Sequence, residues 1–226
     1  LTGAIVDEVP ISKELMENNL AAEGCLDGSY RILANITGMW LIQGIIKSLN
    51  LPDSNETYDK ITKMAKEAKP FTSYINVDDA SLQNPDDMIK AIKEQSIKDS
   101  NVKLKDTSEV IRTALEGIAF RVNETKEKLE KILNINFKRV HAVGGGTRNK
   151  LLCQFIADAT GLEVITGPIE GTAVGNLVSQ LYALGVVKSF QEVRDLIKRS
   201  FKFQTYEPEN TELWKEAFMK FKRFEY

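Results

Sequence analysis

Apolar residues recur at helical spacing most clearly in the middle of the chain. Between residues 107 and 133 they stand three or four positions apart, or at multiples of that step, as in a helix with one buried face. That face consists of Ile111, Leu115, Ile118, Val122 and Leu129. The same spacing over shorter stretches predicts helices at 58–69, 85–98, 190–199 and 210–223.

Two further segments are more apolar and predict buried helices. The first, 35–49, turns Trp40, Leu41, Ile45 and Ile46 toward the core. The second, 171–187, contains no charged residue, and Thr172 is expected to cap it. Interspersed polar residues and short length argue against a membrane span, which needs about 20 predominantly apolar residues.

Strands alternate with helices in the last third of the chain. A strand at 138–143, a glycine turn and a helix ended by Gly161 are followed by a second strand at 162–166. Two successive strand–turn–helix units predict a right-handed crossover and at least one pair of parallel strands. The first 30 residues are strand-like and turn-rich, and short strands are expected at 31–36 and 73–77. The pattern indicates a single α/β domain.

The composition of the chain indicates which binding partners and which cellular compartment to expect. Thirty Lys and Arg against 32 Asp and Glu leave a formal charge of −2, so neither nucleic acid nor an anionic membrane is an expected partner. Cys25 and Cys153 lie far apart and outside any metal-binding spacing, and the first residues contain no signal peptide. These features favour free thiols and a cytoplasmic protein. Because the chain starts with Leu1 inside a strand-like segment, we expect a piece of a longer protein.

The glycine turn is the main candidate for chemistry. Gly144, Gly145 and Gly146 lie between a strand end and a helix start, where backbone can approach a ligand closely and free N–H groups favour phosphate. The turn is not a P-loop, and Asn149 stands where a dinucleotide fingerprint requires its third glycine. A tight turn that merely requires positive φ is the alternative interpretation.

Three other polar residues could have a functional role, but their positions in the sequence favour a structural one. His141 is the only histidine, and it lies in an apolar strand, where we expect a structural role. Asp78 and Asp79 suggest a metal site. Adjacent aspartates in a polar loop ahead of a helix are more often solvated or capping, and that is the role we expect here.

The glycine turn belongs to a longer recognisable string. Residues 142–185 read AVGGGTRNKLLCQFIADATGLEVITGPIEGTAVGNLVSQLYALG, and this region resembles the FGGY family of carbohydrate kinases. The similarity extends to NITGMWLIQ at 35–43 and to the loop at 75–88, so it covers nearly the whole chain. Within the family, the kinases of L-rhamnulose are the most similar.

The resemblance implies a fold and a reaction. It implies an actin-like ATPase domain, a mixed sheet flanked by helices, with residues 1–226 forming the carboxy-terminal, nucleotide-binding half of a two-domain kinase. Such enzymes transfer the γ-phosphoryl group of ATP, with Mg²⁺ on the phosphates, to the 1-hydroxyl of L-rhamnulose. The sugar is then held mainly by an amino-terminal domain that precedes this chain.

The resemblance also assigns nucleotide-site residues by position. Asn35 and Gln43 match nucleotide contacts, Gly144, Gly145 and Gly146 match the phosphate-side turn, and Asn149 matches an adenine-side asparagine. Eight residues on one helix would bring Asn35 and Gln43 to within about 80° of one face. A helix cap and a buried amide are the alternative roles for these two residues. Thr147 and Arg148 receive no assignment.

The chain departs from the family pattern where catalysis would begin. The Gly-x-x-Asp-Thr segment with the catalytic aspartate and the Ser-Gly-Thr loop are both absent, and Asp7 and Glu8 cannot replace them because no glycine loop precedes them. No catalytic and no metal-ligating residue is therefore assigned, and we expect this chain alone to be inactive. We also expect an incomplete sheet, or self-association that covers its exposed face.

Two other functions remain open on the sequence. A family member acting on xylulose, fuculose or glycerol would share this half, since most sugar contacts come from the other domain. An actin-like, sugar-responsive regulatory module would share the fold without the reaction. A Gly-x-x-Asp-Thr segment upstream of Leu1 would favour an enzyme over a regulator. The sequence does not indicate an oligomeric state.

Overall fold

The computed structural model describes residues 1–10 and 12–224. Its helices are α1 (Lys13–Glu17), α2 (Trp40–Ser48), α3 (Asn55–Glu67), α4 (Met88–Ser100), α5 (Thr107–Leu133), α6 (Lys150–Thr160), α7 (Gly171–Ala183), α8 (Phe190–Ser200) and α9 (Thr211–Phe221), with short 3₁₀ turns η1 (Ala80–Leu82) and η2 (Gly145–Arg148). Its strands are β1 (Thr2–Val6), β2 (Leu20–Gly24), β3 (Tyr30–Ala34), β4 (Arg139–Ala142), β5 (Glu163–Thr166) and β6 (Gln204–Tyr206).

The strands form two small sheets. One is antiparallel in the order β1-β3-β2, and the other has the order β4-β5-β6. In the second sheet β4 and β5 run parallel, as the crossover pattern predicts, and β6 adds an antiparallel edge that the sequence did not reveal. The mixed α/β class is confirmed, with two sheets where one was expected.

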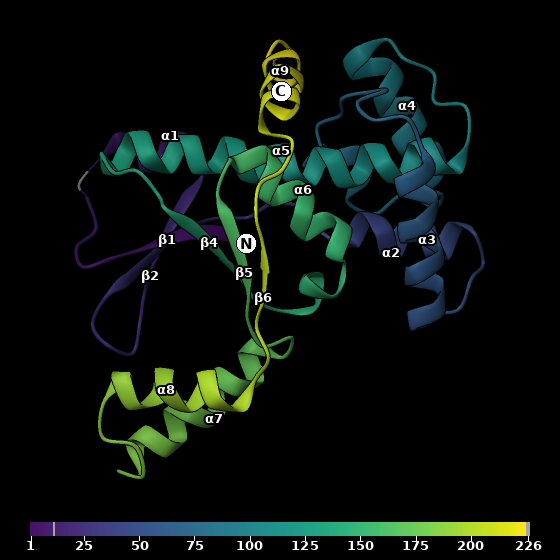
Figure 1. The fold of residues 1–226 in the computed structure, drawn as a ribbon. Coiled ribbons are helices and arrows are strands. Elements are labelled where there is room, and N and C mark those ends of the chain that lie inside the picture. Colours follow the sequence, from purple (N-terminus) through teal and green to yellow (C-terminus); the bar gives the residue numbers. More distant parts are fainter. Residues whose placement is uncertain (11, 225–226) are drawn as a thin grey trace.

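The long helix α5 organises the molecule. In Figure 1 it runs across the fold, with α2, α3 and α4 toward one end and the first sheet toward the other. Its predicted bounds are confirmed, and its predicted apolar face is buried, because packing against α3, α4, α6 and β1 removes that face from water. Asp106 caps its start through the Glu109 N–H, and Asn134 ends it in the left-handed conformation.

Aromatic rings from distant parts of the chain close the core around Phe120 of α5. The ring of Trp214, from α9, lies 5.1 Å from both Phe120 and Phe155 between centroids, and Phe71 meets Trp214 edge to face at 4.9 Å. Phe218 completes the cluster from the same helix. The last helix is therefore part of the main core.

Several predicted boundaries are wrong, and local hydrogen bonding gives the reason. Helix α2 begins at Trp40 and not at Asn35, because residues 35–39 form an irregular connection from β3 whose Thr37 N–H bonds a distant carboxylate. Trp40, which was expected to face the core, is the first residue of the helix and is 49% exposed. Helix α4 begins at Met88, since Asp87 caps it through the Lys90 N–H.

One predicted strand and one predicted buried helix also differ from the structure. Residues 73–77 form no strand; Ile75 and Val77 are buried against α5, as apolar anchors of an irregular segment. Helix α7, expected to be buried, has no buried residue among those described. Figure 1 shows why: α7 and α8 form a pair that stands away from the helices around α5. No described helix is both long and apolar enough for a membrane span.

Candidate functional site

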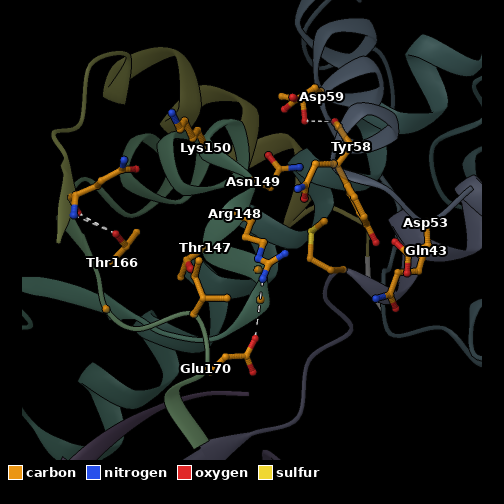
Figure 2. A pocket seen from close by; sticks show the side chains of 18 of the residues that line it. Gln43, Asp53, Tyr58, Asp59, Thr147, Arg148, Asn149, Lys150, Thr166 and Glu170 are labelled. Atoms are coloured by element: carbon orange, nitrogen blue, oxygen red, sulfur yellow. Dashed lines mark hydrogen bonds and ion pairs between the residues drawn. The ribbon is translucent and has the colours of Figure 1, made fainter. Parts of the chain in front are cut away.

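A cleft of about 980 Å³ lies between two walls of different construction. The turn wall comprises η2, the start of α6, the loop after β5 and the segment that leads into β6. The side-chain wall comprises the start of α2, the residues just before α3 and the first part of α3 (Figure 2). The lining residues are Met39, Gln43, Asp53, Asn55, Tyr58, Asp59, Thr62, Gly145, Gly146, Thr147, Arg148, Asn149, Lys150, Thr166, Gly167, Ile169, Glu170, Lys202 and Gln204.

The first glycine of the turn wall meets a backbone requirement. Gly144 has φ +93° and ψ −179°, a backbone conformation that residues with a Cβ rarely adopt. Its N–H donates to the Pro168 carbonyl at 3.1 Å, while the Gly167 N–H donates to the Ala142 carbonyl at 2.7 Å. These two bonds join the turns that follow β4 and β5. Gly144 itself is not among the residues that line the cleft.

The next two glycines meet no such requirement. Neither Gly145 nor Gly146 has positive φ. A Cβ on Gly145 would meet no described protein atom within 4 Å, and one on Gly146 would only touch Met39 Cγ at 3.7 Å. Packing and backbone geometry therefore leave room for a larger residue at Gly145. The alternative interpretation, a tight turn that requires positive φ, therefore applies to Gly144 and not to Gly145.

The two polar atoms of the Asn149 amide differ in their hydrogen bonding. Its Oδ1 accepts the Leu152 N–H at 2.9 Å and so caps α6, which fixes the orientation of the amide. Its Nδ2 is buried and has no hydrogen-bond partner within residues 1–10 and 12–224. An unpaired buried donor costs stability, and an acceptor on a ligand in the cleft would remove that cost.

The start of α7 also faces this cleft. Ile169 and Glu170 line it, and Glu170 is the N-cap residue, with no side-chain cap hydrogen bond. The prediction that Thr172 caps this helix is wrong. Uncapped N–H groups at a helix start carry partial positive charge and favour an anion.

Exposed polar side chains form the opposite wall. Gln43 is exposed on α2 and lines the cleft, so its alternative role as a buried amide is wrong. On α3, burial first and the nearby carboxylate of Asp53 second raise the pKa of Tyr58 above its ordinary value. Ser54 caps α3 from outside the lining, through the Thr57 N–H.

A buried pair on α5 fixes the end of α3. The Arg112 guanidinium donates to the carbonyls of Ala65 and Ala68 at 3.1 and 3.2 Å, and to Glu116 at 2.6 Å. Both oxygens of Glu116 accept the N–H of Phe71, which has a left-handed φ of 52°. The end of α3 is thus fixed by α5. On the cleft side of α3, Asn55 and Asp59 are exposed, while Tyr58 also packs against the core.

Charge is graded across the cleft. Arg148, Lys150 and Lys202 lie on the turn side, and Asp53 and Asp59 on the side-chain wall. Arg148 reaches Glu170 at 4.0 Å near the mouth, as the dashed line in Figure 2 shows, and both side chains are largely exposed. Such a pair is weak and can open for a ligand.

The structure brings together most of the nucleotide-site residues expected from the sequence. Gln43, Gly145, Gly146 and Asn149 line one cleft. Asn35 is exposed, precedes α2 and is absent from the lining. Tyr58, Asp53 and Asp59 were missed, because no local pattern shows that α3 folds over a turn some 90 residues later.

The other candidates take structural or neutral positions. His141 lies in β4 as expected, but its side chain is exposed, because alternate residues of this four-residue strand point away from the core. Asp79 caps η1 through the Ser81 N–H, as expected for a capping role. Cys25 and Cys153 are free thiols, and burial raises the pKa of Cys153 to about 11. The described residues include no group of three metal-ligating side chains.

Comparison with known proteins identifies relatives of this chain. The sequence profile of the carboxy-terminal domain of the FGGY family of carbohydrate kinases matches residues 2–184. A rhamnulokinase of Bacteroides thetaiotaomicron is 35% identical over 222 residues, which cover 98% of this chain and 45% of the relative. The rhamnulokinase of Bacillus subtilis is 31% identical over 207 residues, or 91% and 42%. The chain spans less than half the length of these relatives.

Solved structures agree on the fold at much lower identity. A xylulose kinase from Rhodospirillum rubrum superimposes with a TM-score of 0.67 and 17% identity, covering 98% of this chain and 43% of that one. Plasmodium falciparum glycerol kinase with ADP gives 0.66 and 19%, covering 98% and 45%. These similarities show the actin-like fold of sugar kinases.

Proposed function

The chain belongs to the FGGY family of carbohydrate kinases, and from this premise we propose that its cleft binds ATP for transfer of the γ-phosphoryl group to a sugar. The family match favours a kinase over a sugar-responsive regulatory module. The turn wall carries the proposal, because Gly145 is a glycine that neither φ nor packing requires. Close approach of a ligand to the backbone explains that glycine.

The graded charge supports one orientation of the nucleotide. Phosphates would lie along η2 and the uncapped start of α7, near Arg148 and Lys202, where N–H groups and cations neutralise them. The base and ribose would lie toward Gln43 and Tyr58, where amide and phenol groups can donate and accept hydrogen bonds. Asn149 Nδ2 would donate to an acceptor of the same ligand.

Mg²⁺ fits this arrangement as a companion of the phosphates. It binds through one or two carboxylates, substrate phosphates and several waters, and does not need a cage of protein ligands. The carboxylates of Asp53, Asp59 and Glu170 line the cleft, and one of them would complete such a site. The ion would neutralise charge on the phosphates when bound.

L-rhamnulose is the acceptor we propose, with L-rhamnulose 1-phosphate as product. The relatives above 30% identity are named rhamnulokinases, whereas the solved xylulose and glycerol kinases lie below 20% and support only the fold. A family member specific for xylulose, fuculose or glycerol is the alternative. The cytoplasm, where ATP is available, is the compartment we propose.

Catalysis would need the rest of the protein. Phosphoryl transfer depends on groups that align the acceptor hydroxyl with the γ-phosphate and on a base that takes its proton. The cleft residues here can hold and neutralise the donor. The contacts to the sugar and the catalytic aspartate would come from the rest of the protein. The 226 residues alone should therefore show no kinase activity.

Calorimetric titration with ATP and ADP tests nucleotide binding in this chain directly. Saturable binding that is at least tenfold weaker in Gly145→Val supports the proposal, and binding that is absent or insensitive to this change contradicts it. A coupled assay on the complete kinase, comparing L-rhamnulose with xylulose, fuculose and glycerol, then tests the acceptor. Kinase activity of the 226-residue chain alone would contradict the proposal that catalysis needs the rest of the protein.

A further inference from the structure

The segment between β3 and α2 is tied to a residue far away in sequence. This segment, residues 35–39, is called the connector below. At its middle, the Thr37 N–H donates to Oδ1 of Asp78 at 2.6 Å across 41 residues. At its end, Met39 lines the cleft and precedes the first residue of α2. One hydrogen bond thus holds the segment that leads into the side-chain wall.

The backbone around Asp78 is itself fixed. The Asp78 N–H donates to Asn76 Oδ1 at 3.0 Å, and the Asn76 N–H donates to Asp99 Oδ2 at 2.7 Å. Val77 is buried so tightly against α5 that a Cβ on Gly117 would come within 2.7 Å of its Cγ1. The carboxylate of Asp78 is therefore presented from a rigid support.

The guanidinium of Arg121 orients that carboxylate. Arg121 Nε, from α5, donates to the other oxygen of Asp78 at 2.5 Å, and another Arg121 nitrogen binds Glu124 at 2.5 Å. The three side chains are only 23–26% exposed. Charge-assisted hydrogen bonds at such burial hold geometry more firmly than pairs at the open surface.

We propose that Asp78 is a positioning residue of the nucleotide site. By fixing Thr37 it sets Met39 against the turn wall, where Met39 Cγ lies 3.7 Å from the place of a Cβ on Gly146. It thereby also sets the start of α2, from which Gln43 reaches the cleft. The proposal rests on the proposed function of the cleft, since its consequence is read as nucleotide affinity.

Asp79 provides a matched control within the same loop. Its Oδ1 accepts the Ser81 N–H at 2.9 Å and its Oδ2 pairs with Lys98 at 2.7 Å. Both aspartates thus accept one backbone N–H and pair with one cation, but the hydrogen bonds of Asp79 stay within its own loop and α4. Removing either carboxylate removes similar interactions, and only one of the two touches the connector.

The test compares Asp78→Ala, Asp78→Asn and Asp79→Ala in the 226-residue chain. Titration calorimetry gives the Kd for ADP, amide hydrogen exchange reports the connector, and thermal melting reports the fold. We expect Asp78→Ala to weaken ADP binding about tenfold, as small misplacements of binding groups do, and to speed exchange at Thr37. Asp78→Asn keeps an oxygen for Thr37 and should fall between. Asp79→Ala should lower the melting temperature with an unchanged Kd.

The outcomes separate this proposal from the proposed function. If Asp78→Ala leaves Kd unchanged, or if Asp79→Ala weakens ADP binding equally, the positioning role is overturned. If the unaltered chain binds no ADP, the proposed function fails; faster exchange of the connector amides in Asp78→Ala would then still support positioning, and unchanged exchange would overturn it. If Asp78→Ala does not fold, Asp78→Asn decides by the same measurements.

Discussion

The two walls of the cleft differ in whether the residues that stabilise the fold also face the ligand. On the turn wall, Asn149 both caps α6 and lines the cleft, so this residue shapes the fold and the ligand surface together. On the side-chain wall, α2 and α3 are held by apolar packing, by Ser54 and by Arg112. Tyr58 takes part in that packing, whereas Gln43 and Asp59 line the cleft as exposed side chains. Stability and affinity should therefore change together when Asn149 is replaced by Ala, and separately when an exposed residue of the side-chain wall is replaced.

Gly145 is the exception on the turn wall and should give the largest effect on binding. Gly145→Val places a side chain in the cleft without straining φ or meeting protein atoms. Loss of hydrogen bonds from the turn to phosphate should cost about 1.5–3 kcal/mol, or roughly 10- to 100-fold in Kd for ATP. Calorimetry should show this loss with an unchanged melting temperature; a lower melting temperature with intact affinity would make the glycine structural.

Gly144 should show the reverse balance. Gly144→Ala forces a Cβ onto a backbone with φ +93° and should lower the free energy of unfolding by about 1–3 kcal/mol in urea titration. ATP affinity, measured where the variant is still folded, should change less than in Gly145→Val. Equal loss of affinity in both variants would mean that the two glycines act as one unit.

Asn149 allows the two roles of one residue to be separated. Asn149→Ala removes the cap of α6 and should cost about 1 kcal/mol of stability. Asn149→Asp keeps an oxygen for the Leu152 N–H and removes the Nδ2 donor, so it should retain stability and weaken ATP binding. Paired thermal melts and titrations of both variants measure this. Full ATP affinity in Asn149→Asp would show that Nδ2 does not donate to the nucleotide.

Gln43 should give the smallest effect, confined to affinity. Gln43→Ala removes an exposed amide that lines the cleft, and should weaken ATP binding by about 1 kcal/mol, near fivefold, without a change in melting temperature. Asn35→Ala is the control, because it removes an equally exposed amide outside the lining. If both variants lose the same affinity, the boundary drawn around the cleft is wrong.

The sequence predicted what depends on local periodicity and failed where distant segments decide. Helix α5 was predicted to its bounds because its apolar face repeats over 27 residues. The start of α2 was misplaced because the Thr37 N–H is taken by Asp78, which no local pattern shows. Helix α7 was expected to be buried because it is apolar, but burial also requires a partner surface. Similarly, the glycine turn was identified, while Tyr58 and Asp53 opposite it were not.

The position of α9 has a consequence for synthesis. The family profile ends at residue 184, yet Trp214 and Phe218 supply rings that close the core around Phe120. Helices α5 and α6 leave the ribosome well before these rings are made, with part of their apolar surface still uncovered. Folding of this domain therefore completes only after α9 has emerged, and until then the nascent chain exposes the surface that chaperones recognise.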